Sequence, residues 1–117
     1  MGFGDGTDLV RELFDACDDA DRFVRDMRRL GVVKAEAERR YRVAKAKRTL
    51  YERDENRVQM SIICDVVRGC EEVSNLAFAR DCAEAEYDGN REALLVAKKK
   101  IDTLREIMAR EWAGEGR

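Results

Sequence analysis

The chain has 117 residues, no proline and no histidine, and it is 41% charged but only 7% aromatic, with a formal net charge of −2. This is the composition of one domain made of long helices, and it excludes a sheet protein, which needs β-branched and aromatic runs. We expect no membrane contact and a cytoplasmic location, because no apolar run approaches the roughly 18 residues that span a bilayer and the N-terminus has no signal-peptide pattern.

The first predicted element is a long helix over residues 8–53, preceded by a glycine-rich leader, residues 1–7, that we expect to be flexible. Thr7 or Asp8 is placed to cap its start. Gly31 interrupts the helix, but one glycine costs only about 1 kcal/mol, so we expect a kink or a close contact there and not an end. Apolar residues recur at steps of three and four: Leu9, Leu13, Ala16 or Cys17, Ala20, Val24, Met27, Leu30, Ala37, Tyr41, Ala44 and Tyr51.

A polar stretch then leads to a short helix predicted over residues 61–68. Ser61 is placed to cap its start, and Gly69 to end it in a left-handed conformation. A second long helix follows over residues 71–112, and residues 113–117 are expected to fray. Its stripe contains Val73, Leu76, Arg80, Ala83, Tyr87, Leu94, Ala97, Ile101, Leu104, Met108 and Trp112.

Neither long helix buries its stripe alone, so the sequence predicts an all-α fold. The expected fold is a long antiparallel, coiled-coil-like helical hairpin with the short helix at its tip, forming one domain over residues 8–112. A two-helix hairpin buries little apolar area, so we expect it to complete a bundle as a homo-oligomer, a dimer. A second surface off the main stripe contains Phe23, Phe78, Leu95 and Val96. The predicted structural core contains Leu13, Met27, Tyr41, Cys64, Tyr87, Ile101 and Trp112.

The four cysteines are Cys17, Cys64, Cys70 and Cys82. Their spacings match no zinc-ligand pair, and the histidine that often completes such a site is absent from the chain. We therefore expect reduced thiols that pack as small apolar residues, with Cys64 inside the tip and Cys82 on the packed side of the last helix. A reversible redox role and a metal site are the alternatives that this pattern favours less.

The strongest functional signal is a block of basic residues. Residues 25–53 hold eleven basic and four acidic side chains, whereas residues 54–88 hold nine acidic and three basic ones. In an antiparallel hairpin these segments lie side by side, so we expect charge complementarity across it to fix the register. The alternative is nucleic-acid binding, with arginines on phosphates and tyrosines stacked on bases. The residues expected to contact a partner or phosphates are Arg39, Arg40, Arg42, Lys45 and Arg48.

No motif in the sequence indicates catalysis. Adjacent carboxylates such as Asp18 and Asp19 point in different directions on a helix. There is no nucleophile elbow, no phosphate-binding glycine loop and no metal-binding helix motif. We therefore expect a protein that is not an enzyme and has no catalytic residue, metal or cofactor.

Three stretches carry a family resemblance: AERRYRVAKAKRTLYERDE, VVRGCEEVSNLAFARDCAEAEYDGNREAL and the late REW. They resemble a group of small helical proteins encoded by tailed phages and prophages of Gram-positive bacteria. That group shares a tyrosine-bearing first helix, a short apolar segment ending in Arg-Gly or Lys-Gly, and a long last helix ending in Glu-Trp. The resemblance covers residues 35–112, with Gly69-Cys70 where the group often has Gly-Asp.

The resemblance implies a phage accessory protein in the cytoplasm of the bacterial host. Such a protein is expected to bind an unidentified protein partner, as an adaptor, regulator or inhibitor of a host or phage complex. The group supplies no known site residues, so it adds none to those named above.

Overall fold

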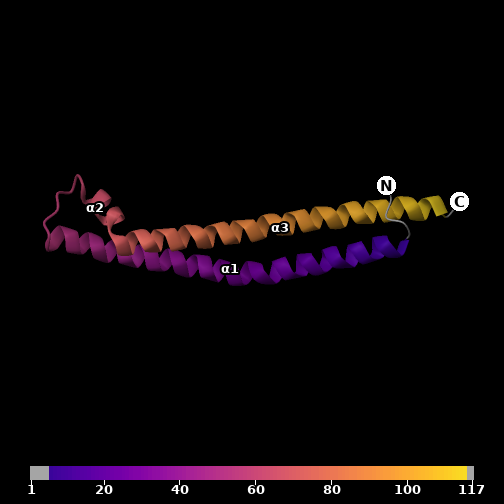
Figure 1. The fold of residues 1–117 in the computed structure, drawn as a ribbon, viewed down its shortest axis with the longest axis horizontal. Helices are drawn as coiled ribbons and strands as arrows, with labels where there is room; N and C mark the ends of the chain where they lie inside the picture. Colours follow the sequence, from indigo (N-terminus) through magenta and orange to yellow (C-terminus); the bar gives the residue numbers. More distant parts are fainter. Residues whose placement is uncertain (1–5, 116–117) are drawn as a thin grey trace. The chain divides into compact units, whose positions relative to one another are not determined.

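The computed structural model describes residues 6–115 and shows three helices with no strand among those residues. Helix α1 spans Gly6–Asp54, α2 spans Ile63–Gly69 and α3 spans Glu71–Glu115. The predicted all-α fold class is confirmed: α1 and α3 run antiparallel, with α2 in the turn that joins them (Figure 1). None of the described helices combines the length and the apolar character needed to cross a bilayer.

Where the sequence predicts one domain, the packing divides into two compact units. The first unit pairs the start of α1, up to Arg28, with the end of α3, from Asp88. The second unit contains residues 29–87 and therefore holds the rest of α1, all of α2 and the start of α3.

The core of the first unit is a heptad-spaced apolar cluster. Leu9 and Ala16 of α1 are buried against Leu104 of α3. Leu13 and Ile101 pack on this cluster as predicted, half-buried, together with Ile107 and Met108. Fully burying an aliphatic side chain such as leucine stabilises a fold by about 1.5–3 kcal/mol, so Leu9 and Leu104 stabilise this pairing. Two polar contacts also join the helices: Asn90 donates to the carbonyl of Phe23 at 2.9 Å, and Lys100 lies 3.4 Å from Glu12.

The core of the second unit is built around α2. Ile63 and Val67, one turn apart on α2, are buried against Val73 of α3. Tyr41, Ala44, Val58 and Cys70 pack on this cluster. The short helix therefore closes the end of the hairpin with one of its faces, as the apolar run in the sequence indicates.

Gly31 is a close-contact point within an unbroken α1. A Cβ placed there would lie 3.5 Å from Cε2 of Tyr87, so the glycine gives the Tyr87 ring room against the helix backbone. The prediction that Gly31 does not end the helix is confirmed.

The ends of both long helices extend further than the sequence predicts. Gly6 and Thr7 are helical and do not belong to a leader, and residues 113–115 continue α3 where fraying was expected. With no proline at either end, nothing interrupts the backbone hydrogen bonds, and Asp8 in the first turn of α1 complements the helix dipole. The remaining leader residues, 1–5, and the tail residues 116–117 lie outside the described residues.

Both predicted caps of α2 are wrong. The amide of Ile62 donates to the carbonyl of Gln59 at 3.1 Å, which places Ser61 inside a turn, and Ile62 becomes an N-cap with no side-chain hydrogen bond. At the other end the chain leaves through an extended Cys70, whose amide bonds to Val67, so Gly69 needs no left-handed conformation. The left-handed residue of this region is Arg57, with φ of 54°.

Two residues predicted in the core are exposed. On α2, Ile63 and Val67 take the buried face, and Cys64, about 100° further around the helix, faces outward. Trp112 is 78% exposed because the packed stripe of α3 ends at Met108. The remaining predicted core residues, Met27, Tyr41 and Tyr87, are half-buried.

Candidate functional site

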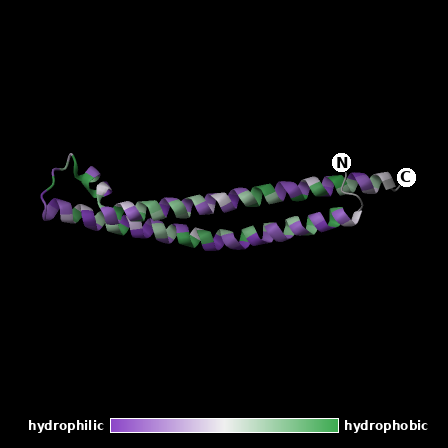
Figure 2. Ribbon diagram, viewed as in Figure 1, coloured by the Kyte–Doolittle hydropathy of each residue, from purple (hydrophilic) through white to green (hydrophobic). Residues whose placement is uncertain are grey.

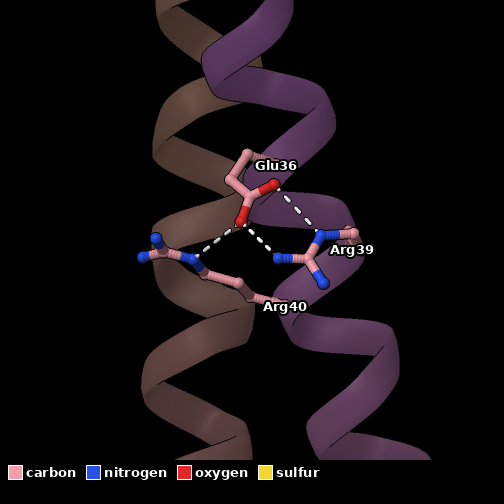
Figure 3. A network of polar contacts seen from close by, with 3 residues as sticks. All are labelled: Glu36, Arg39 and Arg40. Atoms are coloured by element: carbon pink, nitrogen blue, oxygen red, sulfur yellow. Dashed lines mark hydrogen bonds and ion pairs between the residues drawn. The ribbon is translucent and has the colours of Figure 1, made fainter.

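The centre of the basic block is an ion-pair network on the surface of α1 (Figure 3). Arg39 donates to both oxygens of Glu36, at 2.6 and 3.0 Å, and Arg40 donates to Oε1 at 3.2 Å. These are contacts at spacings of three and four, which a helix brings together. Hydrogen bonds from Arg39 and then Arg40 lower the pKa of Glu36 from 4.5 to about 2. The carboxylate therefore stays ionised and offsets part of the positive charge of its two arginines.

Two further predicted contact residues are also paired inside α1. Arg42 donates to Glu38 at 2.8 Å, and Arg48 lies 2.8 Å from Glu52. Lys45, the fifth predicted residue, lies over the ring of Tyr41 at 5.8 Å. These arginines therefore have their carboxylate partners within α1, one helical turn away, and not in the acidic start of α3.

Glu52 is a site residue that sequence reasoning missed, because it looked like part of a polar connection. It is only 3% exposed, the one charged residue buried in the described chain. Arg48 and the side chain of Asn56 both bond to its carboxylate, the latter at 2.9 Å, and its backbone carbonyl accepts from Val58 at 3.0 Å. The network holds the turn after α1 and gives Arg48 a buried carboxylate partner inside the chain.

Arg80 is the second residue that the sequence did not single out. It lies over the ring of Tyr41 at 4.2 Å, bonds to Asp81 at 3.1 Å and reaches Glu38 at 3.8 Å. Burial lowers the pKa of Arg80, but hydrogen bonds to Asp81 and Tyr41 outweigh burial and raise it. The sequence did contain a signal for Arg80, because it lies within the apolar stripe of α3. A cation that packs against α1 there needs a partner on that helix.

A cation also lies over the other packed tyrosine, since Lys34 sits 4.7 Å from the ring of Tyr87. A groove of about 350 Å³ opens beside this stack. Its lining is balanced in charge and contains Gly31, Lys34, Ala35, Glu38, Arg80, Glu84 and Tyr87.

A second groove between α1 and α3 of the second unit has a mainly apolar lining. We call it the valine groove. Its volume is about 430 Å³. The small residues Ala37, Ala79 and Ala83 lie between the larger Val32, Val33 and Leu76, with Glu36 and Arg40 completing the lining. Val32 is 65% exposed, so the groove presents apolar side chains to solvent.

A second exposed apolar surface, the tip patch, consists of Met60, Ile62 and Val66. Ile62, the N-cap of α2, and Val66 are one turn apart and lie on a face that adjoins the buried face of α2. In Figure 2 the part of the loop next to α2 is coloured as hydrophobic, and α2 carries both hydrophobic and hydrophilic colours. The short helix is thus apolar on two faces, only one of which packs inside the chain.

A third exposed apolar region lies in the first unit around Trp112. Two grooves of about 370 and 340 Å³ flank its ring. Val10 and Met108 line one of them, and Leu13 and Met108 line the other.

Of the second surface predicted off the stripe, Phe78, Leu95 and Val96 are exposed, whereas Phe23 is half-buried.

The cysteines show no arrangement for chemistry. Among residues 6–115, no group of acidic and cysteine side chains is placed to hold a metal ion. All four thiols are free, with Cys17 and Cys70 half-buried and Cys64 and Cys82 exposed. The packed position expected for Cys82 is wrong, because its neighbour Ala83 occupies the buried side of α3.

Comparisons with known protein families, with curated proteins and with solved structures each find no match. No relative therefore supplies a function for this chain.

Proposed function

We propose that this chain acts by binding another protein, without catalysis, as an adaptor, regulator or inhibitor of a larger complex. The observation that carries the proposal is the exposed apolar surface: among the described residues, large apolar side chains at the surface outnumber the buried apolar ones. Contiguous exposed apolar patches on a protein mark interaction sites. The resemblance to small helical phage proteins supports a phage or prophage setting inside a bacterial host.

The pairing of the arginines supports the same proposal over nucleic-acid binding. Arg39, Arg40, Arg42 and Arg48 each already contact a carboxylate. Binding to phosphate gains most of its free energy from unpaired cations that displace counterions. Protein interfaces, in contrast, are centred on a few desolvated apolar anchors surrounded by polar contacts.

The tip patch is the part that fits a heterologous partner best. Its residues lie within α2 or just before it, and the adjoining face of this short helix is fixed in the core by Ile63 and Val67. An anchor held by a rigid support binds with less loss of conformational entropy than one on a mobile loop. Met60 adds an adaptable side chain, which suits surfaces that accommodate partners of varied shape.

The test is capture of host proteins by the immobilised chain and by two variants. The double variant Ile62→Asp with Val66→Asp removes the two anchors, whereas Ser61→Asp adds a charge in the same turn and leaves both anchors in place. We expect a discrete partner with the wild type and with Ser61→Asp, and its loss with the double variant. Equal capture by all three proteins, with helical content unchanged, would contradict a role for the tip patch.

A further inference from the structure

Charged residues lie along both edges of the valine groove. On α1, Val33 and Arg40 line the groove, and Lys47 stands one heptad after Arg40 on the same side of the helix. On α3, Ala79 lines the groove, and Glu72 and Glu86 stand one heptad before and after it. The edge formed by α1 therefore carries Arg40 and Lys47, with Glu36 beside Arg40, and the edge formed by α3 carries Glu72 and Glu86.

Arg40 pairs with Glu36, but the other three edge charges are not used inside the chain. Lys47, Glu72 and Glu86 are exposed, and none of them forms an ion pair with another residue of the described range. The network of Glu36, Arg39 and Arg40 lies within α1 and does not cross the groove. The groove therefore combines an apolar centre with Lys47 on one edge and Glu72 and Glu86 on the other, and these three charges have no ion-pair partner in the described range.

We propose that the valine groove binds the same groove of a second copy of this chain. A two-fold axis parallel to the helices sets α1 of each copy against α3 of the other, so each basic edge meets an acidic edge. The other two-fold arrangement sets α1 on α1 and places the basic edges together, which costs free energy. The small residues Ala37, Ala79 and Ala83 allow the helices to approach at the 8–10 Å separation usual for packed helices.

The register of the hairpin identifies a specific pair of charges. Glu38 faces Arg80 and Gly31 faces Tyr87, so moving along α1 moves backward along α3. Lys47, nine residues after Glu38, is level with Glu72, which precedes Arg80 by eight. With the two-fold axis parallel to the helices, Lys47 of one copy meets Glu72 of the other, and the contact occurs twice.

The test is a charge reversal on each edge, followed by mixing. Lys47→Glu and Glu72→Lys each place like charges opposite one another twice in a homodimer, and we expect each to weaken dimerisation roughly tenfold or more. An equimolar mixture of the two variants restores both opposite-charge contacts, so it should dimerise as well as the wild type. Lys99→Glu, an exposed lysine of the first unit, makes the same change of charge away from the groove and should have no effect.

Sedimentation equilibrium across micromolar concentrations measures these dimerisation constants against the 13.5 kDa monomer mass. Recovery of dimer on mixing supports contact between copies, because a contact within one chain is not restored by mixing. A wild type that stays monomeric at high micromolar concentration, or a mixture no heavier than its separate components, overturns the proposal. The tip variant Ile62→Asp with Val66→Asp should remain dimeric, which separates this result from the test of partner capture.

Discussion

At the scale of single residues, helix spacing decides which charges pair. Glu36, Glu38 and Glu52 stand three or four positions from the arginines they contact, so a helix brings the partners together at little entropic cost. These pairs could have been predicted from the sequence, since they need only a helix. The burial of Glu52 could not have been predicted, because it depends on how the turn residues Asn56 and Val58 fold over the end of α1.

The first prediction concerns this buried carboxylate. Glu52→Ala should lower the free energy of unfolding by about 2 kcal/mol, because it removes the partner of Arg48 and of Asn56 at once. Glu52→Gln should cost less, since an amide oxygen still accepts from Asn56. Urea denaturation measures both values. Glu55→Ala, at an exposed position in the same turn, is the control and should change stability little.

The second prediction concerns the surface network of Glu36. Its pKa is lowered to about 2 by Arg39 first and Arg40 second, so Arg39→Ala should return the pKa toward 4.5 and Arg40→Ala should do so less. Because the folded pKa is depressed, the stabilising contribution is complete above pH 4.5 and is lost as the pH falls toward 2. NMR titration of the side-chain carboxyl at low salt measures the pKa. A wild-type pKa near 4.5 at low salt would show that the arginines do not hold the carboxylate.

At the scale of elements, the periodicity of apolar residues predicts the long helices. It does not predict helix caps, because a single local contact determines each of them. The stripes of α1 and α3 identified both long helices, and α2 was visible from its apolar run. The caps of α2 were missed because a turn at Gln59–Ile62 and an extended Cys70 replace side-chain capping. Cys64 was misplaced because a fully apolar short helix does not reveal which face it buries.

The third prediction concerns the contact between α1 and Tyr87. Gly31→Ala should raise the free energy of unfolding by up to about 1 kcal/mol, because alanine favours the helix and its Cβ would meet Tyr87 at an ordinary 3.5 Å. Gly31→Leu should instead destabilise the protein, since the larger side chain displaces the tyrosine ring. Thermal unfolding measures both.

The control for this substitution is Gly89→Ala, where a new Cβ meets nothing within 4 Å. It should stabilise α3 through helix propensity alone. If Gly31→Ala destabilises while Gly89→Ala stabilises, the packing of Tyr87 is tighter than an ordinary contact and the argument from propensity does not hold at Gly31.

At the scale of the whole molecule, the balance of charge separates the two functions that the sequence left open. The chain has a net charge of −2, and four arginines of its basic block are already held by carboxylates. Phosphate would therefore have to compete with a carboxylate at each of these four arginines. Sequence reasoning found the block but compared it with the acidic segment of the other helix, and it overlooked the carboxylates three and four residues away in α1.

The last prediction follows from that balance: the chain should not bind DNA with sub-micromolar affinity, even at low salt. An interface that neutralised six or more phosphates would lose roughly 1,000-fold in affinity between 50 and 200 mM salt, because each phosphate contact releases counterions. Here most of the arginines would first have to give up a carboxylate partner. A fluorescence titration with duplex and single-stranded DNA at several salt concentrations measures the affinity. Tight binding that weakens steeply with salt, and that disappears when Arg39, Arg40 and Arg42 become alanine, would favour nucleic-acid binding, because it would show that these pairs open readily to phosphate.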